Sequence, residues 1–147
     1  MTDFALQLQA FATKAKHNAD RAVSNVVGMV ADEIDKRSPV GDEKLWKRPP
    51  PPGYIGGQFR GNWQLGVNEE PAGPIARIDP SGAETVAEIK ARIPERTVGN
   101  VFYLTNSLPY ANRIENGWST QAPVGVVGLT VASFEVIVEE AIAGGLA

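Results

Sequence analysis

The chain has 147 residues, a formal net charge of -3 and 43% apolar residues, so that one domain spanning residues 1–147 can build a hydrophobic core. The absence of cysteine excludes disulfides, thiolate metal sites and a cysteine nucleophile. The sequence contains neither a basic run typical of sequence-reading nucleic-acid proteins nor a run of about eighteen apolar residues that would span a membrane.

A long amphipathic helix is predicted for residues 3–36. Apolar residues recur there every three or four positions, beginning with Phe4, Leu8 and Phe11. Pro39 ends the helix, because the residue before a proline is pushed out of the helical region. The many alanines toward the N-terminal end would allow close approach to another element, such as a second subunit.

A proline- and glycine-rich insert follows at residues 41–61. Four consecutive prolines at 49–52 predict a short polyproline II rod, and the surrounding glycines exclude a helix. An extended surface loop of this length is usually functional or disordered. Its aromatic residues, Trp46, Tyr54 and Phe59, favour a contact role over a plain linker.

The remaining elements alternate between strand and helix. Strands are predicted at residues 63–67, 75–78 and 101–105 from alternating apolar positions. A short helix is predicted for residues 82–93, and a C-terminal helix is predicted to start near Pro123. The expected fold class is α+β, with the long N-terminal helix and the C-terminal helix packed on a small antiparallel sheet of three to four strands.

The stretch from Leu108 to Pro123 holds the densest polar chemistry of the chain. Its only carboxylate is Glu115, whereas a glycosidase needs two facing carboxylates. The single histidine, His17, falls on the polar side of the long helix, and no nucleophile elbow accompanies it. We therefore expect no catalytic residues, no metal site and no cofactor. A hydrolase using Glu115 with Tyr110 is the enzyme alternative, and it requires a second titratable group nearby.

The same stretch is better explained as a connector between a strand and the last helix. Tyr110 and Ile114 would face inward, Gly117 would supply the chain reversal, and Glu115 would either cap backbone N–H groups or pair with an arginine. Arg60 is one possible partner. The candidate residues for contacts with other subunits or partner proteins are Trp46, Tyr54, Phe59, Arg60, Trp63, Tyr110, Arg113, Glu115 and Trp118.

A series of short motifs occurs in a specific order along nearly the whole chain. They are "SPV" at residues 38–40, "FRGNW" at 59–63, "NSLPYANRIENGWS" at 106–119 and "QAPVG" at 121–125. In order and spacing the sequence resembles the gene-product-ten type family of tail components of long-tailed bacteriophages. Most members run almost directly from the first motif into the strand, whereas here the proline-rich insert intervenes at residues 43–57.

The resemblance implies a structural virion protein for tail completion or tail termination at the head–tail junction, or neck. Such proteins form a ring, here a homo-hexamer, that contacts the tail tube and the neck or connector proteins. DNA would pass through the channel without sequence-specific binding, and no membrane is involved. The protein would be made in the host cytoplasm and end in the virion. The alternative is a minor head or neck protein on the portal side.

Overall fold

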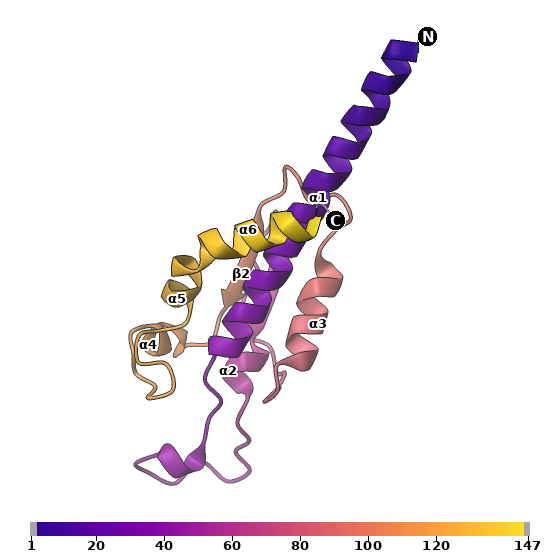
Figure 1. Cartoon of the computed structure of the whole chain (residues 1–147). Coiled ribbons are helices and arrows are strands. Elements are labelled where there is room, and N and C mark those ends of the chain that lie inside the picture. The colour runs from indigo at the N-terminus through magenta and orange to yellow at the C-terminus, as the bar shows by residue number, and fades with distance from the viewer. Residues whose placement is uncertain (1–2, 146–147) are drawn as a thin grey trace.

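A single long helix organises the molecule. The computed structural model describes residues 3–145, and α1 (Asp3–Arg37) runs along most of the molecule (Figure 1). At 1.5 Å per residue it is about 50 Å long. Only its C-terminal half is enclosed, with Gly28, Ala31 and Ile34 buried. The predicted helix at residues 3–36 is confirmed.

The sheet is smaller than expected. β1 (Trp63–Val67) pairs antiparallel with β2 (Phe102–Asn106), and these are the two strands of residues 3–145. The prediction of three to four strands is wrong, because residues 75–78 pair with no strand and are held by side-chain hydrogen bonds instead. The amide of Ile75 donates to Asn62 Oδ1 at 2.9 Å, and Arg77 donates to the carbonyls of Gly61 and Trp63.

Short helices surround this frame. α3 lies along one side of α1 and α6 crosses it (Figure 1), and α3 confirms the short helix predicted at residues 82–93. The expectation that the insert contains no helix is wrong at two single turns, η1 and α2. The bounds are η1 (Glu43–Leu45), α2 (Gln58–Gly61), α3 (Ala83–Arg92), α4 (Ala111–Glu115), α5 (Val127–Ala132) and α6 (Phe134–Gly145).

The C-terminal helix is divided at Ser133 and does not begin at Pro123. The Ser133 hydroxyl donates to the carbonyl of Leu129 and accepts a hydrogen bond from Arg37 of α1. Such back-bonding of a serine often bends a helix. α5 begins only at Val127, where the Glu115 carboxylate caps the first amides.

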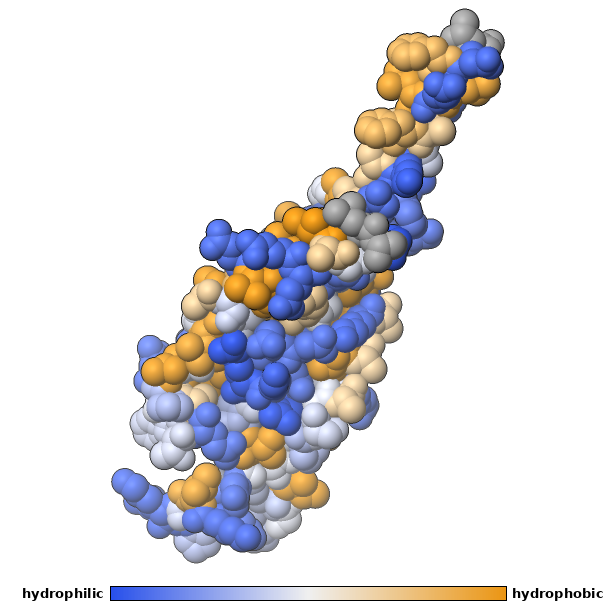
Figure 2. All heavy atoms as spheres, in the orientation of Figure 1, coloured by the Kyte–Doolittle hydropathy of each residue, from blue (hydrophilic) through white to orange (hydrophobic). Residues whose placement is uncertain are grey.

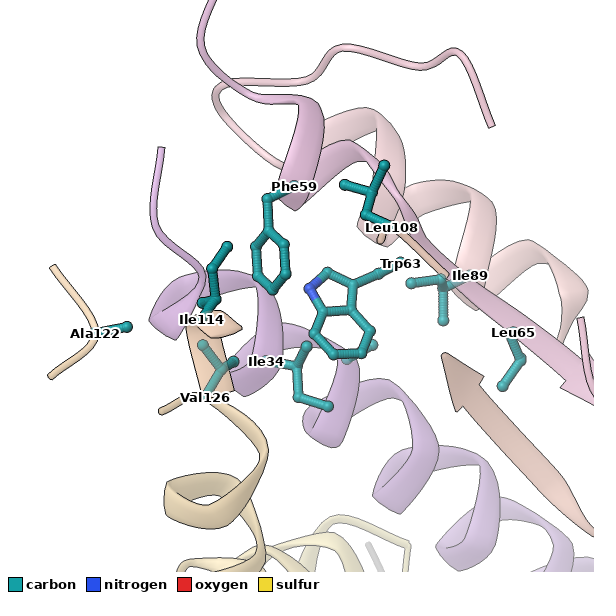
Figure 3. Close-up of a cluster of buried hydrophobic side chains, with 10 residues drawn as sticks. Ile34, Phe59, Trp63, Leu65, Ile89, Leu108, Ile114, Ala122 and Val126 are labelled. Atoms are coloured by element: carbon teal, nitrogen blue, oxygen red, sulfur yellow. The ribbon is translucent and has the colours of Figure 1, made fainter. Parts of the chain in front are cut away.

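The hydrophobic core lies where α1, α2, β1, α3 and residues 108–126 meet. Trp63 is 4% exposed, and its ring meets Phe59 edge-on with centroids 5.8 Å apart. Figure 3 shows the core side chains pointing toward one another from these elements: Ile34, Phe59, Trp63, Leu65, Ile89, Leu108, Ile114, Ala122 and Val126. Within residues 3–145, no helix has both the length and the apolar character needed to cross a membrane.

Candidate interface surfaces

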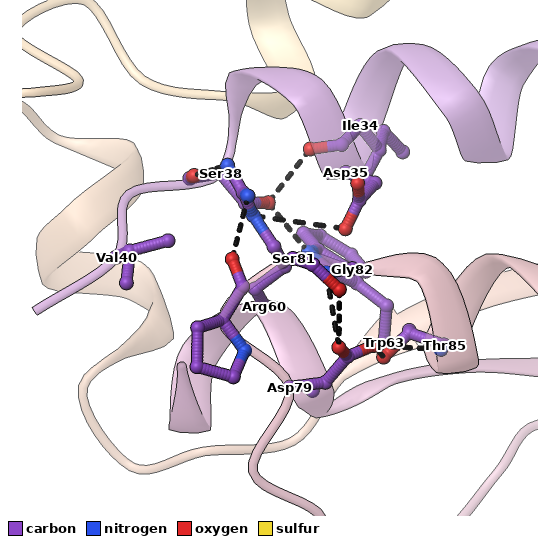
Figure 4. Close-up of polar contacts among 12 residues, drawn as sticks. Ile34, Asp35, Ser38, Val40, Arg60, Trp63, Asp79, Ser81, Gly82 and Thr85 are labelled. Carbon is purple, nitrogen blue, oxygen red and sulfur yellow. Dashed lines mark hydrogen bonds and ion pairs between the residues drawn. The ribbon is translucent and has the colours of Figure 1, made fainter. Parts of the chain in front are cut away.

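The C-terminal end of α1 is held by a buried polar network. The Ser38 hydroxyl donates to the carbonyl of Ile34 at 2.6 Å and accepts from the indole N–H of Trp63 at 2.8 Å. Arg60 donates to the carbonyls of Ser38 and Pro80, both at 2.8 Å. The motifs "SPV" and "FRGNW" are therefore bonded to each other inside one subunit, as Figure 4 shows.

Arg60 pairs with a different carboxylate from the one expected. Its Nε lies 3.7 Å from Oδ1 of Asp35, so the suggested pairing with Glu115 is wrong. Burial raises the pKa of Asp35, and the neighbouring Asp79 and Asp32 add to this effect, while Arg60 opposes it. Asp35 is thus a carboxylate that the fold makes harder to ionise.

Asp79 is in the opposite situation. Burial opposes its ionisation, but its oxygens accept hydrogen bonds from Thr85, Ser81 and Gly82, and these bonds lower its pKa overall. They cap the start of α3. Gly82 has a φ of +78°, and a Cβ at this position would overlap the Asp35 carboxylate, so glycine is required here.

Glu115 is a structural anchor. Its carboxylate accepts hydrogen bonds from the amides of Val126, Val127 and Gly128 at 2.8–2.9 Å, which confirms that it caps backbone N–H groups. Burial acts against ionisation, but these three bonds lower the pKa of Glu115 below its ordinary value. The negative charge of Glu115 therefore stabilises the N-terminus of α5.

The connector is also bonded to the base of the insert. The Gln121 side chain accepts from the amide of Val40 at 3.1 Å and donates to the same residue's carbonyl at 2.7 Å. The hydroxyl of Tyr110 donates to Gln58 at 3.0 Å. Ile114 is buried and Tyr110 half-buried, and Gly117 reverses the chain at a φ of +84°, all as predicted.

Two groups of aromatic candidates remain on the surface. In the connector, the Arg113 guanidinium lies 5.3 Å from the ring centroid of Trp118, whose side chain is 74% exposed. In the insert, the rings of Trp46 and Tyr54 are in contact, with their centroids 4.7 Å apart. A cleft of about 630 Å³ lies beside Tyr54 and Gln121, between the insert and the connector.

The candidate residues thus divide by position. Phe59 and Trp63 are buried within the subunit, where their side chains pack in the core. Arg60 and Glu115 bond within the subunit, as described above. The surface aromatic residues are Trp46, Tyr54, Tyr110 and Trp118, of which Tyr54 and Tyr110 are half-buried.

Sequence reasoning expected the N-terminal end of the long helix to approach another element through its alanines, but it did not identify the exposed apolar side chains there. Residues 3–17 of α1, called the arm below, project beyond the body of the molecule (Figure 1). Phe4 is 73% exposed and Phe11 is 70% exposed, and Leu8 is exposed as well. Apolar residues follow the same three- and four-residue spacing in the arm and in the packed half of α1, so this spacing could not show which half is buried. The one indication in the sequence was the length of the predicted helix, because a domain of this size is too small to bury the whole of so long a helix.

A second apolar line runs over the C-terminal helices. Val127 and Val131 of α5 and Phe134 and Ile142 of α6 are all exposed, and Val138 between them is half-buried. We call these five residues the α5–α6 stripe. Figure 2 shows hydrophobic side chains both on the arm and over α6, next to hydrophilic ones.

Comparisons with protein-family models, with curated proteins and with solved structures give no match. Among residues 3–145, no group of three or more histidine, aspartate or glutamate side chains is arranged to hold a metal ion.

Proposed function

We propose that the protein is a structural virion protein of a long-tailed bacteriophage, a tail-completion or tail-terminator subunit at the head–tail junction that works as a ring of six. The phage class comes from the ordered motifs. The geometry supports the proposal because those motifs bond to one another: Ser38 is bonded to Arg60 and Trp63, and Gln121 joins the connector to Val40. Motifs used in this way preserve a shape, which is what an assembly subunit needs.

The observation that carries an assembly role is the unburied apolar surface. Soluble monomers rarely leave contiguous apolar patches larger than a few hundred square ångströms exposed. This chain exposes Phe4, Leu8 and Phe11 on a projecting helix and a second apolar line on α5 and α6. A subunit whose neighbours cover these surfaces explains them directly.

The charge and the insert fit the same role. A net charge of -3 is of the sign that lets DNA slide past a ring without sticking, because like charges repel. The proline-rich insert extends from the body at the end opposite the arm (Figure 1), where it could reach a neighbouring ring or the tail tube. Its paired rings, Trp46 and Tyr54, provide an apolar contact there.

The test begins with purified virions. We expect the protein in them, and electron microscopy of tail ends should show a ring at the junction. Absence of the protein from virions would contradict the proposal. Immunolabelling of detached tails and of heads then decides the side: label on tails supports tail completion, and label on heads supports the portal-side alternative.

A further inference from the structure

We propose that the arm of one copy packs on the α5–α6 stripe of the next copy. The occupant of each surface would thus be the same chain, joined head to tail. This inference rests on the proposed function because it assumes that the protein forms a ring. It names the contact between subunits that would build that ring.

The first argument is the match of the two apolar patterns. On the arm, Phe4, Leu8 and Phe11 follow one another at spacings of four and three positions. The α5–α6 stripe begins Val127, Val131, Phe134, with the same spacings of four and three across the division at Ser133. Apolar residues at such spacing form the seam of two helices packed at a small angle.

The second argument is charge. The arm carries Lys14 and Lys16, both exposed, against one acidic residue, Asp3. α6 carries Glu135 and Glu139 beside the stripe, both exposed, and it contains no lysine or arginine. The opposite charge of the two surfaces favours this pairing.

The third argument is length. The arm has about 15 residues and is about 22 Å long, and the stripe covers a similar number of residues, 127–142, on two successive helices. α6 also ends beside the point where the arm leaves the body (Figure 1), so an arm that points away from its own body reaches the stripe of a neighbour.

The contact joins two different surfaces. Such heterologous contacts propagate from subunit to subunit and close into a ring when the rotation allows. Pairing of two arms would instead be isologous and would stop at a dimer.

Two matched double variants test the contact. The arm variant carries Phe4→Gln and Phe11→Gln, and the stripe variant carries Val131→Gln and Ile142→Gln. All four positions are exposed in the subunit, and circular dichroism checks that each variant is folded. By sedimentation velocity we expect the wild type to form oligomers and each variant alone to remain monomeric.

Mixing the two variants is the decisive step. The arm variant keeps an intact stripe and the stripe variant keeps an intact arm, so a mixture should form a one-to-one heterodimer and stop there. Dimers of the stripe variant alone would show arm–arm pairing and overturn the proposal. A monomeric wild type, or variants that assemble like the wild type, would overturn it equally.

Charge exchange provides a second readout. Lys14→Glu with Lys16→Glu, or Glu135→Lys with Glu139→Lys, should weaken association by about two- to five-fold for each reversed pair, and the combination should restore it. Failure of the combination to restore association would contradict the role of these charges in the contact. These outcomes are independent of virion content: a protein absent from virions whose variants behave as expected would keep this inference and overturn the proposed function.

Discussion

The two ends of α1 belong to one helix, but their surroundings differ completely. At the C-terminal end, Ser38 bonds to Trp63 and Arg60, and Ile34 is buried. In the arm, Phe4 and Phe11 have the same apolar character and helical spacing but remain exposed. The difference teaches that an apolar stripe on a helix does not tell which part of it the rest of the chain covers. Within this subunit the rest of the chain covers one half.

The largest expected effect on the free energy of unfolding is at the packed C-terminal end of α1. Trp63→Ala removes the central ring of the core and leaves the Ser38 hydroxyl without its indole partner. We expect the free energy of unfolding to fall by about 3–5 kcal/mol, measured by urea denaturation. The matched control is Trp118→Ala, at an exposed ring, which should change stability by less than about 0.5 kcal/mol. Equal losses for the two tryptophans would contradict the assignment of the core.

The second effect concerns the cap of α5. Glu115→Gln removes the charge from three hydrogen bonds, and we expect a loss of about 1–2 kcal/mol at neutral pH. Urea denaturation at pH 7 measures this loss. Glu139→Gln, at an exposed position of α6, is the control for loss of one acidic charge.

The pH dependence of the same variant sharpens this prediction. The folded-state pKa of Glu115 is lowered, so its stabilisation is complete above the ordinary glutamate value of about 4.3 and is lost as the pH falls through the lowered pKa. The difference between the wild type and Glu115→Gln should therefore shrink toward low pH. A difference that stays constant with pH would contradict the capping role. If Glu115 were instead catalytic, the substitution would abolish turnover and leave assembly intact.

At Asp35 we expect a substitution to have a smaller effect on the free energy of unfolding, and to raise it instead of lowering it. Its folded-state pKa is raised, so ionisation costs folding energy at all pH values above the unfolded pKa. Asp35→Asn should therefore be neutral or stabilising by less than about 1 kcal/mol at pH 7. The gain should vanish below the ordinary aspartate value of about 3.9, where the carboxyl is protonated in both states. Thermal unfolding at pH 7 and pH 3 measures this, and a clear loss at pH 7 would show that the pairing with Arg60 outweighs burial.

The smallest effect on the subunit is expected in the arm. Phe4→Gln with Phe11→Gln should leave the free energy of unfolding within about 0.5 kcal/mol of the wild type, at concentrations where both are monomeric. Urea denaturation measures this difference. A larger loss would mean that the arm packs on its own body, and the contrast between the two ends of α1 would disappear.

Local sequence patterns determined several parts of this protein. The three- and four-residue spacing and Pro39 were enough for α1, because helix periodicity and the proline restriction are local properties. The same is true of α3, β1 and β2, and of the chain reversal at Gly117. For Glu115 the sequence indicated a structural role but left open whether it caps backbone N–H groups or pairs with an arginine, and the structure shows the cap.

Only the tertiary structure decided the remaining questions, because each depends on groups far apart in the sequence. Residues 75–78 read as a strand, but Asn62 and Arg77 supply side-chain hydrogen bonds in place of a third strand. The partner of Arg60 is Asp35, which α1 brings close and no spacing rule predicts. Above all, the sequence by itself could not tell which part of the α1 stripe is covered, because burial is a property of how the whole chain packs and periodicity is a property of the helix alone.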